Sequence, residues 1–125
     1  MRPIARAAHA VIGWLLVAAL VVQVWLAGLG VFESPGFFAT HRDVGYTISL
    51  LPIVLLVLGF LGGMGRRLAL IAALIFALMI LQSVFVVMRT LTPAIAALHP
   101  VNGFLVLLVA IMLARESWAM RTATV

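Results

Sequence analysis

Hydrophobic residues occur along this chain in four long runs, separated by short segments that are polar or rich in glycine. A bilayer core of about 30 Å is crossed by roughly 20 apolar helical residues, so each run approaches or exceeds the length of a transmembrane helix. The predicted spans cover about residues 8–31, 41–63, 67–89 and 99–118. The pattern predicts an all-α integral membrane four-helix bundle that forms a single domain over residues 1–125.

Composition supports a membrane protein. Hydrophobic residues make up 66% of the 125 residues, more than a soluble domain of this size can bury. The first run follows two arginines, but it is too long for a typical signal peptide and we expect it to be a retained span. The chain contains no cysteine, which excludes disulfides, thiolate metal sites and iron–sulfur clusters.

The arginines are distributed unevenly between the two ends of the predicted spans. Arg42 and Arg89 fall on one side of the predicted bundle. The arginines on the other side are Arg2, Arg6, Arg66, Arg67, Arg115 and Arg121. By the positive-inside rule, both termini and the 62–67 loop are predicted to be cytoplasmic, in the inner membrane of a bacterium. The net charge of +5 is thus a topology signal and requires no nucleic-acid partner.

The two halves of the chain share a sequence frame. HRDVGY at residues 41–46 and HPVNGF at 99–104 both read His-x-x-x-Gly-aromatic. Gln23 precedes the first His by 18 residues, and Gln82 precedes the second by 17. Two hairpins of the same in–out sense are parallel repeats, related by a pseudo-twofold axis along the membrane normal. We therefore expect His41 and His99 to lie at similar depth and to face each other.

Local signals predict where the helices begin and bend. Thr40 and Asp43 resemble the N-cap and third residue of a capping box, which predicts a helix starting after Thr40. Pro100 suits the first position of the last helix. Pro93 predicts a short separate turn over residues 93–98, and Pro52 predicts a kink in the second span.

The histidine pair is open to three kinds of chemistry: haem ligation, metal ligation and proton relay. Zinc or copper needs three or four ligands, and on that side only Glu33 and Asp43 are available besides the histidines. A relay needs carboxylates inside the bundle, and none is expected there. Haem needs only two axial imidazoles and a flat apolar slot, so His41 and His99 are predicted to ligate one haem b.

Residues around the pair complete the predicted cofactor site. The candidates are Gly45, Gly103, Tyr46, Phe104, Gln23, Gln82, Arg42 and Arg89. Each glycine lies one helical turn beyond its histidine and leaves bare backbone for a porphyrin. The aromatic residues would flank the ring edge, the glutamines would hydrogen-bond a propionate or an imidazole, and the arginines would pair with propionates.

Other interpretations of these residues stay open. The glycines also suit close helix packing, and each glutamine also suits an interhelical hydrogen bond. Arg42 has Asp43 or a lipid phosphate as alternative partners. His9 lacks the repeated frame, so we expect it to be solvated at the membrane interface.

Three segments resemble the haem A synthase family. LQSVFVVMRTLTPAIAALHPVNGFLVLLVAIMLAR (81–115) is similar to that family's glutamine-containing helix, short outer segment and histidine-bearing helix. THRDVGYTISLL (40–51) is similar to its His-Arg helix start, and VQVWLAGLGVFE (22–33) to its first span. The resemblance implies a four-helix half-module whose second and fourth helices carry the haem ligands, here His41 and His99.

The chain also departs from that family. The family has eight spans, and this chain has four predicted ones. The family's catalytic acid lies just before the first histidine, where this chain has Phe37, Phe38, Ala39 and Thr40. The family's outer cysteine pair is absent. Haem A synthesis is therefore not expected, and small four-span bacterial membrane proteins share this pattern.

The sequence thus predicts a cytochrome b-like protein that transfers electrons or serves as a redox accessory subunit, with a redox partner or a larger membrane complex. One alternative is a structural subunit without a cofactor that uses the same glycines for helix packing. Another is a bundle that binds a quinone or another small molecule.

Overall fold

A computed structural model describes residues 1–122 and consists of helices joined by short turns. The helices are α1 (Arg2–Phe32), α2 (Phe37–Ile48), α3 (Leu51–Gly62), α4 (Gly65–Val87), α5 (Pro93–Ala96) and α6 (Leu98–Thr122). No strand occurs in the described part of the chain. Four helical units are long and apolar enough to cross a membrane: α1, α2 with α3, α4, and α5 with α6. The predicted all-helical fold with four membrane-spanning helices is confirmed.

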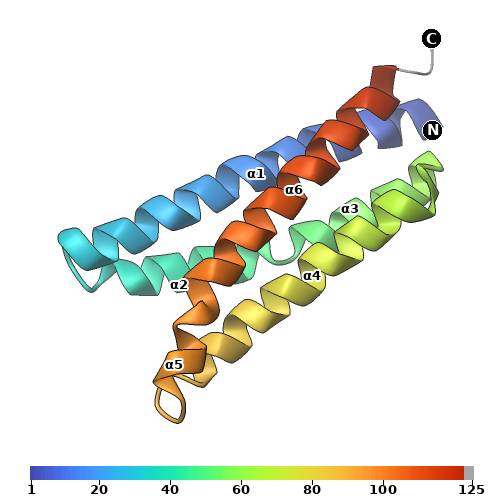
Figure 1. Cartoon of the computed structure of the whole chain (residues 1–125). Helices are drawn as coiled ribbons and strands as arrows, with labels where there is room; N and C mark the ends of the chain where they lie inside the picture. The colour runs from blue at the N-terminus through green and yellow to red at the C-terminus, as the bar shows by residue number, and fades with distance from the viewer. Residues whose placement is uncertain (123–125) are drawn as a thin grey trace.

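The four long units pack as a ring (Figure 1). α1 packs against α3 and α6, and α4 packs against the same two helices. α3 and α6, the returning helices of the two hairpins, therefore lie diagonally across the bundle, as the repeat predicts. The N-terminus, the α3–α4 link and the end of α6 lie at one end, called here the arginine end (Figure 1). The opposite end, with the α1–α2 turn and α5, is called the histidine end.

The core is a narrow column of apolar side chains between the helices. Its fully buried large members include Leu16, Leu55, Leu68, Ile75 and Leu113. Only 17–28% of the most apolar 18-residue window of each span is buried inside the protein. Most of the apolar side chains therefore face outward, which suits helices surrounded by lipid.

Small residues bring α1 and α6 close together. A Cβ atom on Gly13 would lie 3.3 Å from the Cα atom of Ala114 and 3.3 Å from Cδ2 of Leu113. Close approach of small residues is the usual way in which membrane helices gain packing energy, because lipid offers them no hydrophobic driving force.

Pro52 interrupts the second span, as the sequence predicts. The helix ends at Ile48 and resumes at Leu51, with the proline in the first turn of α3. Proline has no backbone N–H and therefore breaks the helical hydrogen-bond ladder. The Ser49 hydroxyl donates to the carbonyl oxygen of Tyr46 at 2.6 Å, which satisfies one acceptor beside the break.

The predicted helix starts are wrong by a few residues. α2 begins at Phe37 after Gly36, not after Thr40, because turns through 34–36 supply carbonyl acceptors for the N–H groups of residues 37–39. The Asp43 carboxylate accepts from Arg42 and caps no helix. α6 begins at Leu98, two residues before Pro100, and the short segment before it is α5.

Candidate functional site

His41 and His99 make the same hydrogen bond in the two halves of the protein. Nδ1 of His41 lies 3.0 Å from the backbone carbonyl oxygen of Gln23, and Nδ1 of His99 lies 3.2 Å from that of Gln82. A carbonyl oxygen can only accept, so each Nδ1 carries the proton and donates it. Nε2 of each ring makes no hydrogen bond among the described residues, and an Nδ1–H bonded to a backbone carbonyl is common among metal-ligating histidines.

The two rings approach each other at the histidine end. Their centroids are 6.1 Å apart and their planes are inclined by 70°. Both side chains are half-buried, and they come from different hairpins. A spacing and inclination of this kind are those of an edge-to-face contact between two aromatic rings. The structure thus brings one imidazole from each hairpin to the same place.

Glutamine side chains lie over the two glycines of the frame. A Cβ atom on Gly45 would lie 3.6 Å from Oε1 of Gln23. A Cβ atom on Gly103 would lie 3.2 Å from Nε2 of Gln82, which is tighter than ordinary contact. The frame therefore brings histidine, glycine and glutamine together in each half.

The two glutamines differ in their own partners. Asn102 is buried and donates from Nδ2 to Oε1 of Gln82 at 2.8 Å and to the Leu78 carbonyl at 2.9 Å. Val44 stands at the equivalent position of the first half, so Gln23 has no such partner. The Gln23 side chain is only 8% exposed, and its Nε2 has no hydrogen-bond partner among the described residues. A buried donor without an acceptor is costly, which points to an acceptor from outside the chain.

Sequence reasoning did not single out Asn102. The available signal was its position inside HPVNGF, where a strongly polar residue stands in an otherwise apolar span. Polar residues within membrane helices are expensive and usually serve a specific contact.

The other predicted site residues are exposed or have other partners in the structure. Tyr46 is 60% exposed and Phe104 58% exposed, so both face outward. Arg42 pairs with Asp43 at 2.8 Å, which was one of the alternatives for it. Arg89 donates to the carbonyl oxygen of Val86 at 3.1 Å.

His9 is not solvated at the membrane interface, contrary to the sequence prediction. Its side chain is fully buried, and neither ring nitrogen has a hydrogen-bond partner within the described part of the chain. The expected solvation at the interface is therefore wrong. The physical reason is Gly59 of α3, which leaves room for the ring: a Cβ atom there would lie 3.7 Å from Nε2 of His9.

The described residues do not bring together the three or four side-chain ligands that a zinc or copper ion needs. Within residues 1–122, no three side chains of His, Cys, Asp or Glu come together in a way that could hold a metal ion. The histidine end thus brings together two imidazoles, one from each hairpin.

The fold and the site describe a small multi-pass membrane protein with a polar histidine–glutamine cluster in each half. A model of the family of unknown function DUF6220 matches residues 23–91, more than half of the chain, and the chain belongs to this family. The match includes His41 and both glutamines and ends before His99. No curated protein and no solved structure matches the chain. The resemblance to the haem A synthase family stays a prediction.

Proposed function

We propose that His41 and His99 ligate one haem b and that the protein carries electrons, as a small membrane cytochrome or a redox accessory subunit. The observation that carries this proposal is the approach of two rings whose Nε2 atoms are both free, with centroids 6.1 Å apart. When bound, haem supplies reversible one-electron transfer at its iron. If His41 and His99 both ligated the iron, no position would remain for a substrate, which favours electron transfer.

The chain's own residues would orient and hold the ring. The carbonyl oxygens of Gln23 and Gln82 fix the tautomer and direction of the two imidazoles. The buried Nε2 of Gln23 would donate to an acceptor on the cofactor, such as a propionate. Gly45 has no side chain that would cover the backbone at this point. The Gln23 amide beside it has no hydrogen bond like the one that Asn102 donates to Gln82, so it is freer to move. Access over Gly45 is therefore easier than over Gly103.

A visible absorption spectrum of the detergent-purified protein tests the proposal. After expression with ample haem supply, we expect a sharp low-spin spectrum and about one haem per chain. The spectrum follows from two imidazole ligands to one iron. Protein that stays colourless under these conditions would overturn the proposal and leave the cofactor-free packing interpretation.

We also propose that the arginine end faces the cytoplasm of a bacterial cell and that the haem lies near the outer face. The support is the excess of arginine at that end. Reporter fusions after residues 36, 64, 95 and 125 are then expected to report out, in, out and in. The last fusion point lies outside the described residues. An external C-terminus would contradict the parallel repeat, since each hairpin would then no longer return to the same side.

A further inference from the structure

The second span is packed into the bundle along α3 and is held by few contacts along α2. Both helices have 12 residues. α2 has a single buried residue, Ile48 at its last position, and packs mainly on α1. α3 packs on both α1 and α4, and its buried residues are Pro52, Leu55, Gly59 and Gly62. A segment with few buried contacts opens at a lower free energy than the rest of a fold.

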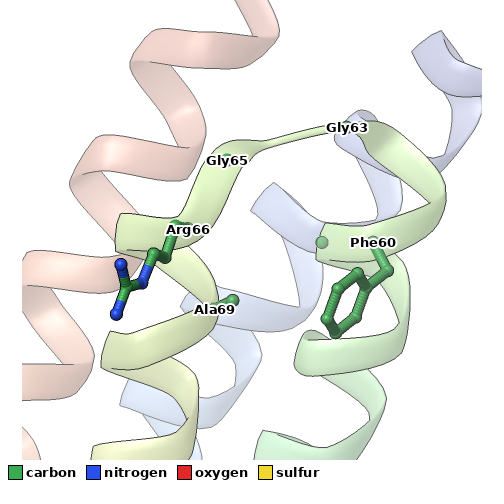
Figure 2. A pocket seen from close by; sticks show the side chains of 6 residues that line it. Phe60, Gly63, Gly65, Arg66 and Ala69 are labelled. Atoms are coloured by element: carbon green, nitrogen blue, oxygen red, sulfur yellow. The ribbon is translucent and has the colours of Figure 1, made fainter.

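The far end of α3 has further attachments to its neighbours. Arg6 of α1 donates from Nε to the carbonyl oxygen of Gly62 at 2.8 Å. Figure 2 shows the short link from Gly63 to Gly65, which joins the end of α3 directly to the start of α4. α3 is therefore fixed to both neighbours, and movement within this span falls on α2.

The break between α2 and α3 supplies a hinge. Residues 49 and 50 form a turn outside both helices, and Pro52 has no N–H to donate to the Ile48 carbonyl. The equivalent of Pro52 in the other half, 58 residues later, is Ala110, which lies inside the unbroken helix α6. The span that carries His41 can therefore bend at a point where the span that carries His99 is continuous.

Fewer hydrogen bonds attach α2 to α1 than attach α6 to α4. The bond from His41 to the Gln23 carbonyl is the one side-chain hydrogen bond between α1 and α2 among the described residues. Three such bonds join α6 to α4 at the same end of the bundle, donated by His99 and Asn102. Val44 stands in α2 where α6 has Asn102, and it can donate none.

The closed position of α2 leaves a buried donor unsatisfied. The Gln23 side chain is buried, and its Nε2 has no partner in the described part of the chain. Gly45 of α2 covers this amide, since a Cβ atom there would lie 3.6 Å from Oε1 of Gln23. Movement of α2 away from α1 would expose the amide to water or to an entering ligand and recover part of its desolvation cost.

An apolar contact opposes this movement at the start of α2. The Phe38 ring lies on bare backbone at Gly30, where a Cβ atom would be 2.8 Å from its Cε1. Phe38 is 46% exposed, so this contact lies at the protein surface and can part without opening the core.

We infer that α2 is a hinged gate over the histidine–glutamine cluster, which bends at residues 49–50 while α6 keeps its half of the cluster fixed. The inference rests on the proposed function only for the identity of the molecule admitted, which is haem. Opening moves His41 and Gly45 away from Gln23 and leaves His99 in place. Closure of α2 then brings His41 to a ligand already held at His99.

Hydrogen–deuterium exchange of the full chain, purified without haem and placed in nanodiscs, tests the gate. We expect the amides of residues 44–48 to exchange at least about tenfold faster than those of their equivalents 102–106, the effect of two fewer hydrogen bonds. Val44→Asn gives α2 the amide that Asn102 supplies in α6. This variant should slow exchange at 44–48 about fivefold, the effect of one added hydrogen bond.

Thr47→Asn is the matched control, because it places the same side chain on the exposed face of α2 with a similar helix propensity. Exchange should be unchanged in that variant. If Val44→Asn fails to fold, Gly30→Leu decides the question: its side chain must displace the Phe38 ring and should speed exchange in α2. Equal exchange in the two wild-type segments, or no response to Gly30→Leu, would overturn the gate.

The rate of haem uptake, followed by stopped-flow absorbance, separates the gate from the proposed function. Val44→Asn should slow uptake by the same factor as exchange. Slower exchange with unchanged uptake would overturn the gate and leave haem binding standing. Faster exchange in α2 of a protein that binds no haem would support the gate and overturn the proposed function.

Discussion

His41→Ala and His99→Ala are each expected to abolish the sharp low-spin spectrum of a bis-imidazole haem. Each change removes one of the two proposed axial ligands and leaves the other histidine in place, with its backbone hydrogen bond to Gln82 or Gln23 intact. A five-coordinate form with shifted bands is the expected product. Absorption spectra of the purified variants, with haem content measured per chain, give the result.

Added imidazole sharpens this test. The space left by the alanine should admit free imidazole, and the low-spin spectrum should then return, whereas a purely structural role for the histidine would give no such rescue. His9→Ala is the control, because His9 packs against Gly59 near the end of α3, at the arginine end and remote from the pair. A full low-spin spectrum in either single variant of the pair would contradict the ligand assignment.

The repeated frame made the meeting of each histidine with its glutamine predictable from sequence. The interval from each glutamine to its histidine predicted that the two residues share one end of a hairpin. The structure joins them by a hydrogen bond, but through the glutamine backbone rather than the side-chain amide. A sequence pattern reports only side chains, and every residue type has a backbone carbonyl. A hydrogen bond to a backbone carbonyl therefore cannot be predicted from the residue type of its acceptor.

Two features of the structure could not be predicted from the sequence, for different reasons. The burial of His9 depends on Gly59, a residue 50 positions away, and only the packing of α1 on α3 brings them together. The start of α2 at Phe37 depends on the turn through Ser34–Gly36. Thr40 and Asp43 have the spacing of a capping box, but the turn before Phe37 starts the helix three residues earlier, so Thr40 lies inside it.

Gly13→Leu is expected to have the largest effect on folding. A Cβ atom at this position would meet the α6 backbone at Ala114 Cα, at 3.3 Å, and backbone cannot turn aside as the end of a flexible side chain can. The added atoms must therefore push α1 and α6 apart at this contact. Overpacking of this kind costs about 1–3 kcal/mol, and here it acts on a contact that links the two hairpins. The free energy of unfolding in mixed micelles, followed by circular dichroism, measures the loss.

Gly28→Leu in the same helix is the control that separates the effect of the packing clash from the effect of helix propensity on stability. No atom lies within 4 Å of a Cβ built on Gly28, so its leucine would enter open space. Leucine is favoured over glycine in a helix by roughly 1 kcal/mol, so this variant should be as stable as the wild type or slightly more so. The same gain is available to Gly13→Leu, and any net destabilisation there must come from the clash. Equal stability of the two variants would show that α1 and α6 are not held together at Gly13, and the ring of helices would need another closing contact.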